Sequence, residues 1–201
     1  MQLTSETLER AVEHLSKLPG VGRKSAQRLA MHLVKQDKDQ VLQLAQALID
    51  LKQKIRYCSS CFTITDDDPC PICRSAKRQR NVLCVVEESR DVYVIEKTNE
   101  FRGSYHVLGG VISPLDDVGP DDIRIKELIA RVNSNSEPVS EVILALNPDA
   151  EGEATSFYIH KMLSPFGVKV TRIAHGIPMG TELEFIDEAT LSKAFIGRNI
   201  F

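Results

Sequence analysis

Residues 58–73 read CSSCFTITDDDPCPIC, in which two Cys-x-x-Cys pairs are separated by eight residues. Each pair can present two thiolates to one edge of a tetrahedral metal ion, and the turn-forming run from Asp66 to Pro69 can bring the pairs together. We therefore expect one structural zinc ion per chain, with no open coordination position for catalysis. The expected ligands are Cys58, Cys61, Cys70 and Cys73. Two disulfides or a redox pair are the alternatives. The lack of an export signal disfavours disulfides, and two matched pairs are more than a redox site needs.

Helical periodicity fills the chain before these cysteines. Apolar residues recur at helical spacing over 8–18, stop at the Pro-Gly-Val-Gly run of 19–22, and resume over 26–33. A third amphipathic pattern covers about 40–55. The sequence therefore predicts a helix, a tight hairpin and a second helix, followed by a third helix.

The predicted hairpin has the residues of a phosphate-binding turn. Gly20 and Gly22 allow close approach of the backbone, and the amides that follow lie at the positive end of a helix dipole. Arg23, Lys24 and Arg28 add positive charge, so we expect a sequence-independent contact with the DNA backbone. A Walker-type loop is disfavoured because position 23 is not glycine and a helix precedes the turn. The segment resembles a helix-hairpin-helix DNA-binding motif, and an ordinary helical turn is the alternative.

Charge is distributed unevenly along the chain. Residues 1–81 contain 14 Lys and Arg against 9 Asp and Glu, whereas residues 82–201 contain 11 against 19. This pattern suggests that the basic front half meets phosphates, although ordinary scatter of surface charge is the alternative. No stretch approaches the roughly 20 apolar residues of a membrane span, and no signal-peptide core is present, so we expect a cytoplasmic protein.

The second half of the sequence has the alternating strand and helix patterns of an α/β domain. Short apolar runs at 82–86, 105–108, 142–146 and 168–173 alternate with helical patterns near 90–97, 122–133 and 153–163. Buried strands separated by helices are typical of a parallel sheet with crossover helices. We therefore expect a domain boundary near residue 80, a buried thiol at Cys84, and a last short helix near 189–196.

Acidic and amide residues follow two of the predicted strands. Glu87 ends the first, and Asn147, Asp149 and Glu151 come directly after the third. Strand ends of this kind bind ligands in parallel sheets, so these residues form a candidate magnesium or partner site. The arrangement resembles the Toprim domain of topoisomerases, primases and related nucleases, which uses a Glu and an Asp-x-Asp. Asn147 stands where that pattern has its first Asp, which should weaken metal binding. Helix N-terminal charge is the alternative role for Glu151 and Glu153.

The order of these modules resembles the bacterial recombination mediator family RecR across the whole chain. The resemblance implies a helix-hairpin-helix region at 1–56, a four-cysteine zinc finger at 57–80, a Toprim-like domain at 81–176 and a C-terminal segment at 177–201. Glu182 to Asp187 resembles the Walker B-like segment of the family. Because no Walker A motif accompanies it, we infer no ATP hydrolysis from this segment.

Membership of this family would imply a non-enzymatic role in DNA repair. The protein would act with RecO and RecF to help load RecA at single-strand gaps, would assemble as a dimeric or tetrameric ring, and would associate with the nucleoid. Two rivals remain from the residues themselves. One is a Toprim-type nuclease or primase-like enzyme that uses Glu87 and Asp149, and the other is a zinc-stabilised adaptor without DNA contact.

Overall fold

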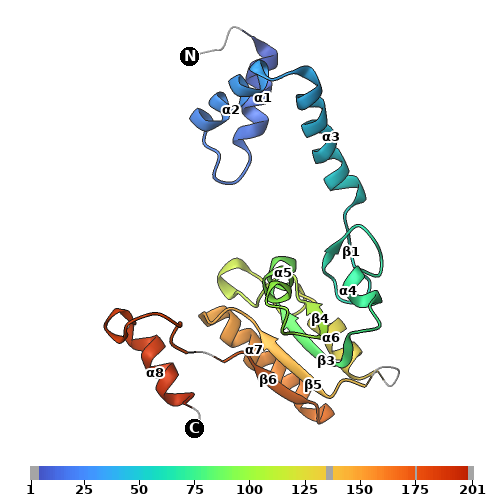
Figure 1. Ribbon diagram of the computed structural model, residues 1–201, viewed down its shortest axis with the longest axis vertical. Helices are drawn as coiled ribbons and strands as arrows, with labels where there is room; N and C mark the ends of the chain where they lie inside the picture. Colours follow the sequence, from blue (N-terminus) through green and yellow to red (C-terminus); the bar gives the residue numbers. More distant parts are fainter. Residues whose placement is uncertain (1–4, 135–137, 175, 199–201) are drawn as a thin grey trace. The chain divides into compact units, whose positions relative to one another are not determined.

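The computed structural model describes residues 5–134, 138–174 and 176–198 (Figure 1). The chain divides into two compact units, Met1–Ile55 and Arg56–Phe201. Among the described residues, none of the helices combines the length and the apolar character needed to cross a lipid bilayer.

The first unit is helical, as predicted. Its helices are α1 (Glu6–Ser16), α2 (Arg23–Lys35) and α3 (Lys38–Lys54). Ser5 caps α1 by accepting a hydrogen bond from the Leu8 amide at 3.4 Å. Val12 of α1 packs against Ala26 and Ala30 of α2, and these small side chains let the two helices approach closely. The hairpin between α1 and α2 therefore has its own small apolar core.

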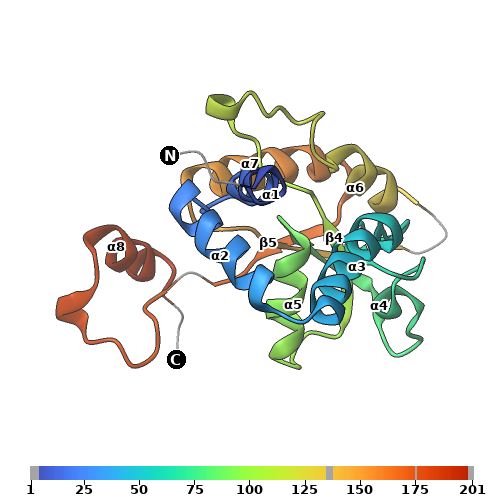
Figure 2. The same ribbon diagram turned by 90° about the horizontal axis from the view of Figure 1, so that it is seen from above.

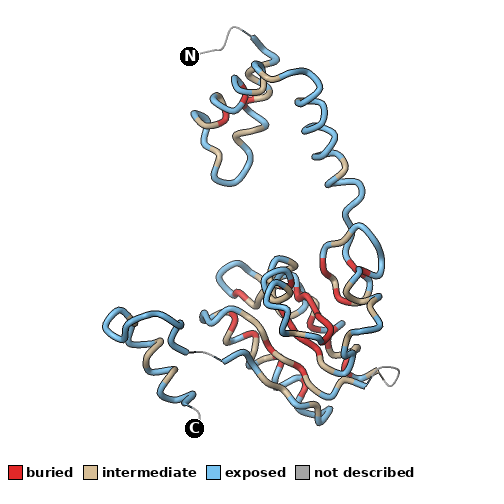
Figure 3. Tube along the Cα trace, viewed as in Figure 1, coloured by how far each residue is buried: buried red, intermediate tan, exposed pale blue. Residues whose placement is uncertain are grey.

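The third helix leaves its apolar face open. α3 contributes no buried residue to the described part of the chain, and Figure 3 shows it without a buried segment. Its exposed apolar side chains include Leu42, Leu44, Leu48, Ile49 and Leu51. The predicted helix is confirmed, but the residues that gave it an amphipathic pattern have no cover within this unit.

The second unit is built on a four-stranded parallel sheet, which confirms the predicted fold class. The strands are β3 (Gln79–Val86), β4 (Gly103–Val107), β5 (Glu141–Ala145) and β6 (Lys169–Arg172), in the order β4-β3-β5-β6. The main crossover helices are α5 (Ser89–Lys97), α6 (Ile125–Val132) and α7 (Ala150–Leu163). Short 3₁₀ helices occupy η1 (Pro114–Asp116) and η2 (Ser164–Phe166). The central strand β3 ends in four consecutive buried residues, as expected for a strand covered on both faces.

Two apolar layers lie on opposite faces of the sheet. On one face Leu83 and Val85 share a cluster with Leu128 of α6 and Ile159 of α7. On the other face Val92 of α5 joins a second cluster. Figure 2 shows α6 and α7 on one side of the strands and α5 on the other, and Figure 3 shows the buried segments following the strands. The sheet is therefore the middle layer of the second unit.

The cysteine segment is part of this second unit. Its elements are β1 (Arg56–Tyr57), β2 (Ile64–Thr65) and the single-turn helix α4 (Pro71–Arg74). Three of its cysteines belong to the same buried cluster as Val86, Tyr105 and Val107. The amide of Val107 donates to the Cys61 carbonyl at 2.8 Å, and Arg131 donates to the Ser60 carbonyl at 3.2 Å. The cysteine segment therefore covers the outer edge strand β4.

The C-terminal segment contains η3 (Leu183–Phe185) and α8 (Glu188–Ile196). Asp187 caps α8 by accepting from the Thr190 amide at 2.9 Å. Lys193 of α8 lies 3.2 Å from a carboxylate oxygen of Glu153 on α7. The Walker B-like residues 182–187 thus form a 3₁₀ turn and a helix cap in this structure, and no strand forms within them.

Candidate metal centre and nucleic-acid interface

Four cysteine sulfurs converge in the cysteine segment. The Sγ atoms of Cys58, Cys61, Cys70 and Cys73 all lie within 4.8 Å of one another. The Cys61 and Cys70 sulfurs are 3.6 Å apart, close to the roughly 3.8 Å that a tetrahedral zinc with bonds of about 2.3 Å requires. Three of these side chains are buried and Cys73 is half-buried. The donor set fits one structural zinc ion and, being complete, leaves no position for a substrate.

Backbone amides orient the cysteine sulfurs. The Cys70 amide donates to the Cys58 sulfur at 3.3 Å, and the Cys73 amide donates to the Cys70 sulfur at 3.4 Å. A hydrogen bond from Cys61 lowers the pKa of Cys73 to about 5, and donating that bond raises the pKa of Cys61 far above its usual range. One thiolate therefore forms readily in this cluster, and metal binding would displace the remaining protons.

Phe62 anchors the cysteine segment to the sheet. Its φ of 63° lies in the left-handed region, which costs a bulky residue on the order of 1–3 kcal/mol. The ring meets that of His106 edge-on at 5.3 Å between centroids, and the Arg124 guanidinium lies 4.8 Å from its centre. These contacts offset at least part of the backbone strain. Sequence reasoning missed Phe62, His106 and Arg124 because the three meet only in the folded structure.

His106 is buried on β4 beneath the cysteine segment. Its Nε2 lies 2.7 Å from the Arg124 carbonyl oxygen, so Nε2 carries the proton and donates it. Burial lowers the pKa of His106 to about 4, and its ring is therefore neutral at physiological pH. A neutral ring suits its place against the Phe62 edge, where a buried charge would be costly.

The amino terminus of α2 has neither a side-chain cap nor an acidic residue in its first turn, whereas the uncapped helices α3 and α6 each have an acidic residue there. Gly22 is the N-cap residue and provides no side-chain hydrogen bond, and the first turn contains no acidic residue. By contrast Ser5, Asp149 and Asp187 cap α1, α7 and α8. The amides of the first turn of α2 are therefore available to an external acceptor.

The two hairpin glycines serve different purposes. Gly20 has a φ of +78°, a conformation that disfavours any side chain. Gly22 has an ordinary φ of −73°, and a Cβ there would meet nothing within 4 Å. The fold itself therefore does not require glycine at position 22, whereas a ligand that approaches the backbone closely would.

The three predicted DNA-binding cations have different surroundings. Lys24 and Arg28 are exposed on α2, one helical turn apart. Arg23 instead forms an ion pair with Glu9 of α1. The structure therefore gives Arg23 a role in holding the hairpin together and leaves Lys24 and Arg28 facing solvent.

The basic residues at 74–80, which follow the last cysteine, make contacts mainly within the fold. Arg74 donates to Asp67 at 2.9 Å. The side chain of Arg78 is only 14% exposed, pairs with Glu96 and donates to the carbonyls of Phe101 and Gly103 at 3.3 and 3.4 Å. These contacts make 74–80 a weaker candidate for phosphate binding than the start of α2.

The acidic strand ends meet, and each of their carboxylates already accepts a hydrogen bond within the fold. The amide of Asn147 donates a hydrogen bond to Glu87. Asp149 accepts from the Gly152 amide at 2.8 Å, and Glu151 accepts from the Ser113 hydroxyl at 2.6 Å. Burial raises the pKa of Glu87, and the charge of Asp149 adds to this shift. Across residues 5–134, 138–174 and 176–198, the four cysteines are the one group of three or more such side chains close enough to share a metal ion.

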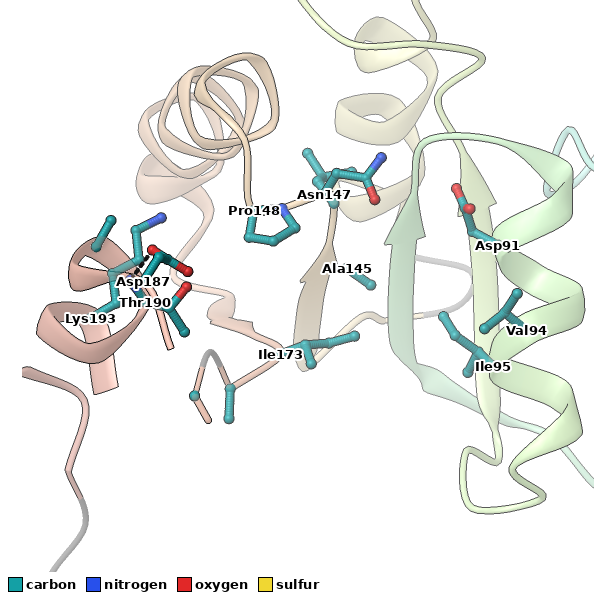
Figure 4. A pocket seen from close by; sticks show the side chains of 14 residues that line it. Asp91, Val94, Ile95, Ala145, Asn147, Pro148, Ile173, Asp187, Thr190 and Lys193 are labelled. Atoms are coloured by element: carbon teal, nitrogen blue, oxygen red, sulfur yellow. Dashed lines mark hydrogen bonds between the residues drawn. The ribbon is translucent and has the colours of Figure 1, made fainter. Parts of the chain in front are cut away.

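A cavity of about 780 Å³ adjoins Asn147 (Figure 4). Figure 4 shows its walls, with Asp91 on α5 and with Asp187 and Lys193 at α8. Asp91 belongs to the capping box of α5, and Asp187 caps α8. Both aspartates therefore serve helix ends, and among the described residues neither joins Glu87 in a group of three or more side chains close enough to share a metal ion.

Comparisons with known proteins cover nearly the whole chain. Family models match residues 8–52 (RecR, helix-hairpin-helix), 55–75 (the RecR zinc finger domain with four cysteines), 81–174 (Toprim domain) and 176–199 (RecR, C-terminal). The chain is 56% identical over 204 residues to "Recombination protein RecR" of Chloroherpeton thalassium, and 57% identical over 203 residues to that of Chlorobium limicola. Each alignment covers 99% of both proteins. The predicted modules and the structural zinc ion are confirmed, and the chain belongs to the RecR family of recombination proteins.

Proposed function

We propose that this protein is a non-enzymatic DNA-binding mediator of recombinational repair in the bacterial cytoplasm, associated with the nucleoid. It acts with RecO and RecF to promote loading of RecA at single-strand gaps. Family membership supports the role in recombination. The observation that carries direct DNA contact is the uncapped start of α2, where an open glycine precedes two exposed cations. A salt-dependent binding assay of a Lys24 and Arg28 double variant, argued in the Discussion, tests it.

The proposed contact uses backbone and side chains together. A DNA phosphate accepts hydrogen bonds from the first-turn amides of α2, and Gly22 lets it come close. Lys24 and Arg28 neutralise this phosphate or its neighbours. Such contacts recognise no base sequence, which suits a protein that acts wherever a gap occurs. In this proposal residues 1–56 bind DNA and take part in assembly, 57–80 bind zinc, and 81–176 with 177–201 serve partners.

The exposed face of α3 supports assembly into a dimeric or tetrameric ring. Leu44, Leu48 and Leu51 lie at helical spacing and are 46%, 59% and 57% exposed. Exposed apolar stripes of this kind mark interaction surfaces. In a homo-oligomer, a second copy would cover the stripe.

Leu48→Glu is expected to lower the native mass of the protein. The wild type should run as two or four copies of the 22.4 kDa chain, and a charge within the apolar stripe should dissociate it. Gln43→Glu adds the same charge at an exposed polar position of α3 and should leave the mass unchanged. Native mass spectrometry checks both variants. A monomeric wild type, or a Leu48→Glu protein of unchanged mass, would refute assembly through α3.

The rival is a metal-dependent Toprim enzyme. In such an enzyme the groups beside Glu87 would bind a divalent ion, whereas Asn147 here places an amide donor against that carboxylate. Asp149 is also committed to the cap of α7. These contacts favour a partner-binding or structural role for the strand ends over phosphoryl transfer.

Asn147→Asp is expected to raise divalent metal affinity without creating strand cleavage. A unit charge about 4 Å from a divalent ion gains about 2 kcal/mol even at the dielectric constant of water, so affinity should rise by roughly tenfold or more. Cleavage also needs a positioned nucleophile and leaving group. Manganese titration measures affinity, plasmid and single-strand incubation with magnesium or manganese measures cleavage, and Asn147→Ala is the uncharged control. Metal-dependent cleavage by the wild type would overturn the non-enzymatic assignment.

A further inference from the structure

Three side chains form a layered stack at the surface of the cysteine segment. The Arg124 guanidinium lies 5.0 Å from the centre of the Tyr57 ring and 4.8 Å from the centre of the Phe62 ring. Phe62 is partly buried against the core, whereas Tyr57 is 59% exposed. Tyr57 is therefore the outer layer, and more than half of it faces solvent.

Every layer of this stack is held in place. Tyr57 pairs with Ile64 in the β1–β2 ladder and immediately precedes the zinc ligand Cys58. The Phe62 ring packs against His106. The Arg124 amide donates to the Leu108 carbonyl at 2.9 Å, which fixes the backbone beneath the guanidinium. A flat group that binds on Tyr57 would thus lose little affinity to ordering of the protein.

We propose that Tyr57, backed by Arg124, is a stacking site for an unpaired base of single-stranded DNA. Aromatic rings stack on any base, and a cation behind the ring is compatible with this π contact. A base is the part of the strand that fits this site, because the Tyr57 ring is 59% exposed and offers a flat π surface on which a base can stack. The inference rests on the proposed DNA-binding function and adds a preference for single strands.

Tyr57→Ala in the full-length protein tests the site. Affinity for an oligothymidine should fall roughly 5- to 150-fold, the range of a stacked aromatic, while affinity for an abasic strand of equal length stays unchanged. The salt dependence should also stay unchanged, because no cation is removed. Tyr57→Phe should retain the wild-type affinity. Tyr93→Ala is the matched control, since Tyr93 is 70% exposed on α5 of the same unit.

A fluorescent variant reports the contact directly. The chain contains no tryptophan, so Tyr57→Trp introduces a single indole at the stacking position. Oligothymidine should quench its emission and the abasic strand should not, whereas the Tyr93→Trp control should respond to neither. One bound zinc per chain verifies that each variant is folded.

The outcomes separate this inference from the proposed function. If the wild type binds neither strand, the proposed function fails. If it binds both but Tyr57→Ala binds equally well and Tyr57→Trp is not quenched, the stacking site is refuted and DNA binding stands. If Tyr57→Ala instead lowers the native mass, the ring belongs to an interface between copies, which also overturns the inference.

Discussion

Replacing Cys70 by Ser is expected to abolish stoichiometric zinc binding and to unfold residues 56–80 cooperatively. Structural zinc in small modules contributes roughly 10–16 kcal/mol of apparent binding energy near neutral pH, as much as the whole stability of a typical domain. The loss should extend beyond the cysteine segment, because Cys58, Cys61 and Cys70 share a buried cluster with Tyr105 and Val107. The edge strand β4 should therefore lose protection as well.

Two measurements check this expectation. Elemental analysis of reduced, chelator-free protein gives the zinc content, and amide hydrogen exchange gives the protection of 56–80 and of β4. Cys84→Ala is the matched control, since Cys84 is buried in the same cluster but lies outside the group of four sulfurs. It should keep one zinc per chain and lose only core packing. Wild-type protein without zinc would contradict the assignment, and loss confined to 56–80 would contradict the coupling to β4.

The zinc site and the order of elements could be predicted because their signals are local. Cysteine spacing depends on the chain's immediate geometry, and the helical and strand patterns reflect burial of nearby residues. The strand order β4-β3-β5-β6 and the packing of the cysteine segment on β4 could not be read in this way. They depend on contacts such as Val107 with Cys61, whose residues are far apart in the sequence.

The roles of charged side chains were harder to predict from the sequence than the burial of apolar ones. Glu151 and Glu153 fit the first turn of α7, yet Asp149 provides the cap, because its short side chain reaches the Gly152 amide. Arg23 reads as a phosphate contact in sequence, but the fold brings Glu9 beside it. A charge pattern identifies a candidate, and only the partner across the fold decides whether that charge is used internally.

Gly152 illustrates a signal that sequence reasoning could have found. It is buried in the first turn of α7, and a Cβ there would overlap the Asn147 carbonyl oxygen. Glycine at this point lets the segment that carries Asn147 lie directly against the helix. The position of Asn147 beside Glu87 therefore depends on Gly152. Helix propensity alone would mark this glycine only as a residue that destabilises the helix.

The double variant Lys24→Ala with Arg28→Ala is expected to weaken DNA binding equally across unrelated sequences. Each cation that neutralises a phosphate releases counterions, so the dependence of affinity on salt should flatten by up to about two units of slope. Titrations at several salt concentrations with two unrelated DNA sequences measure both effects. Lys52→Ala with Lys97→Ala removes the same charge from exposed positions of α3 and α5, and should change neither quantity.

The double variant should bind DNA more weakly but should be no less stable than the wild type. This combination distinguishes a binding role from a structural one. Lys24 lies in the first turn of α2, where a cation opposes the helix dipole by roughly 0.3–1 kcal/mol when no anion is bound. Both side chains are exposed and lie outside the Val12, Ala26 and Ala30 core, so their removal should leave the melting temperature of the DNA-free protein unchanged or slightly higher. If Lys24 lowers the stability of the free protein but strengthens DNA binding, its presence is explained by the ligand that it contacts. Unchanged affinity and salt slope would instead assign the pair to a solvated surface, and DNA contact would have to lie elsewhere on the protein.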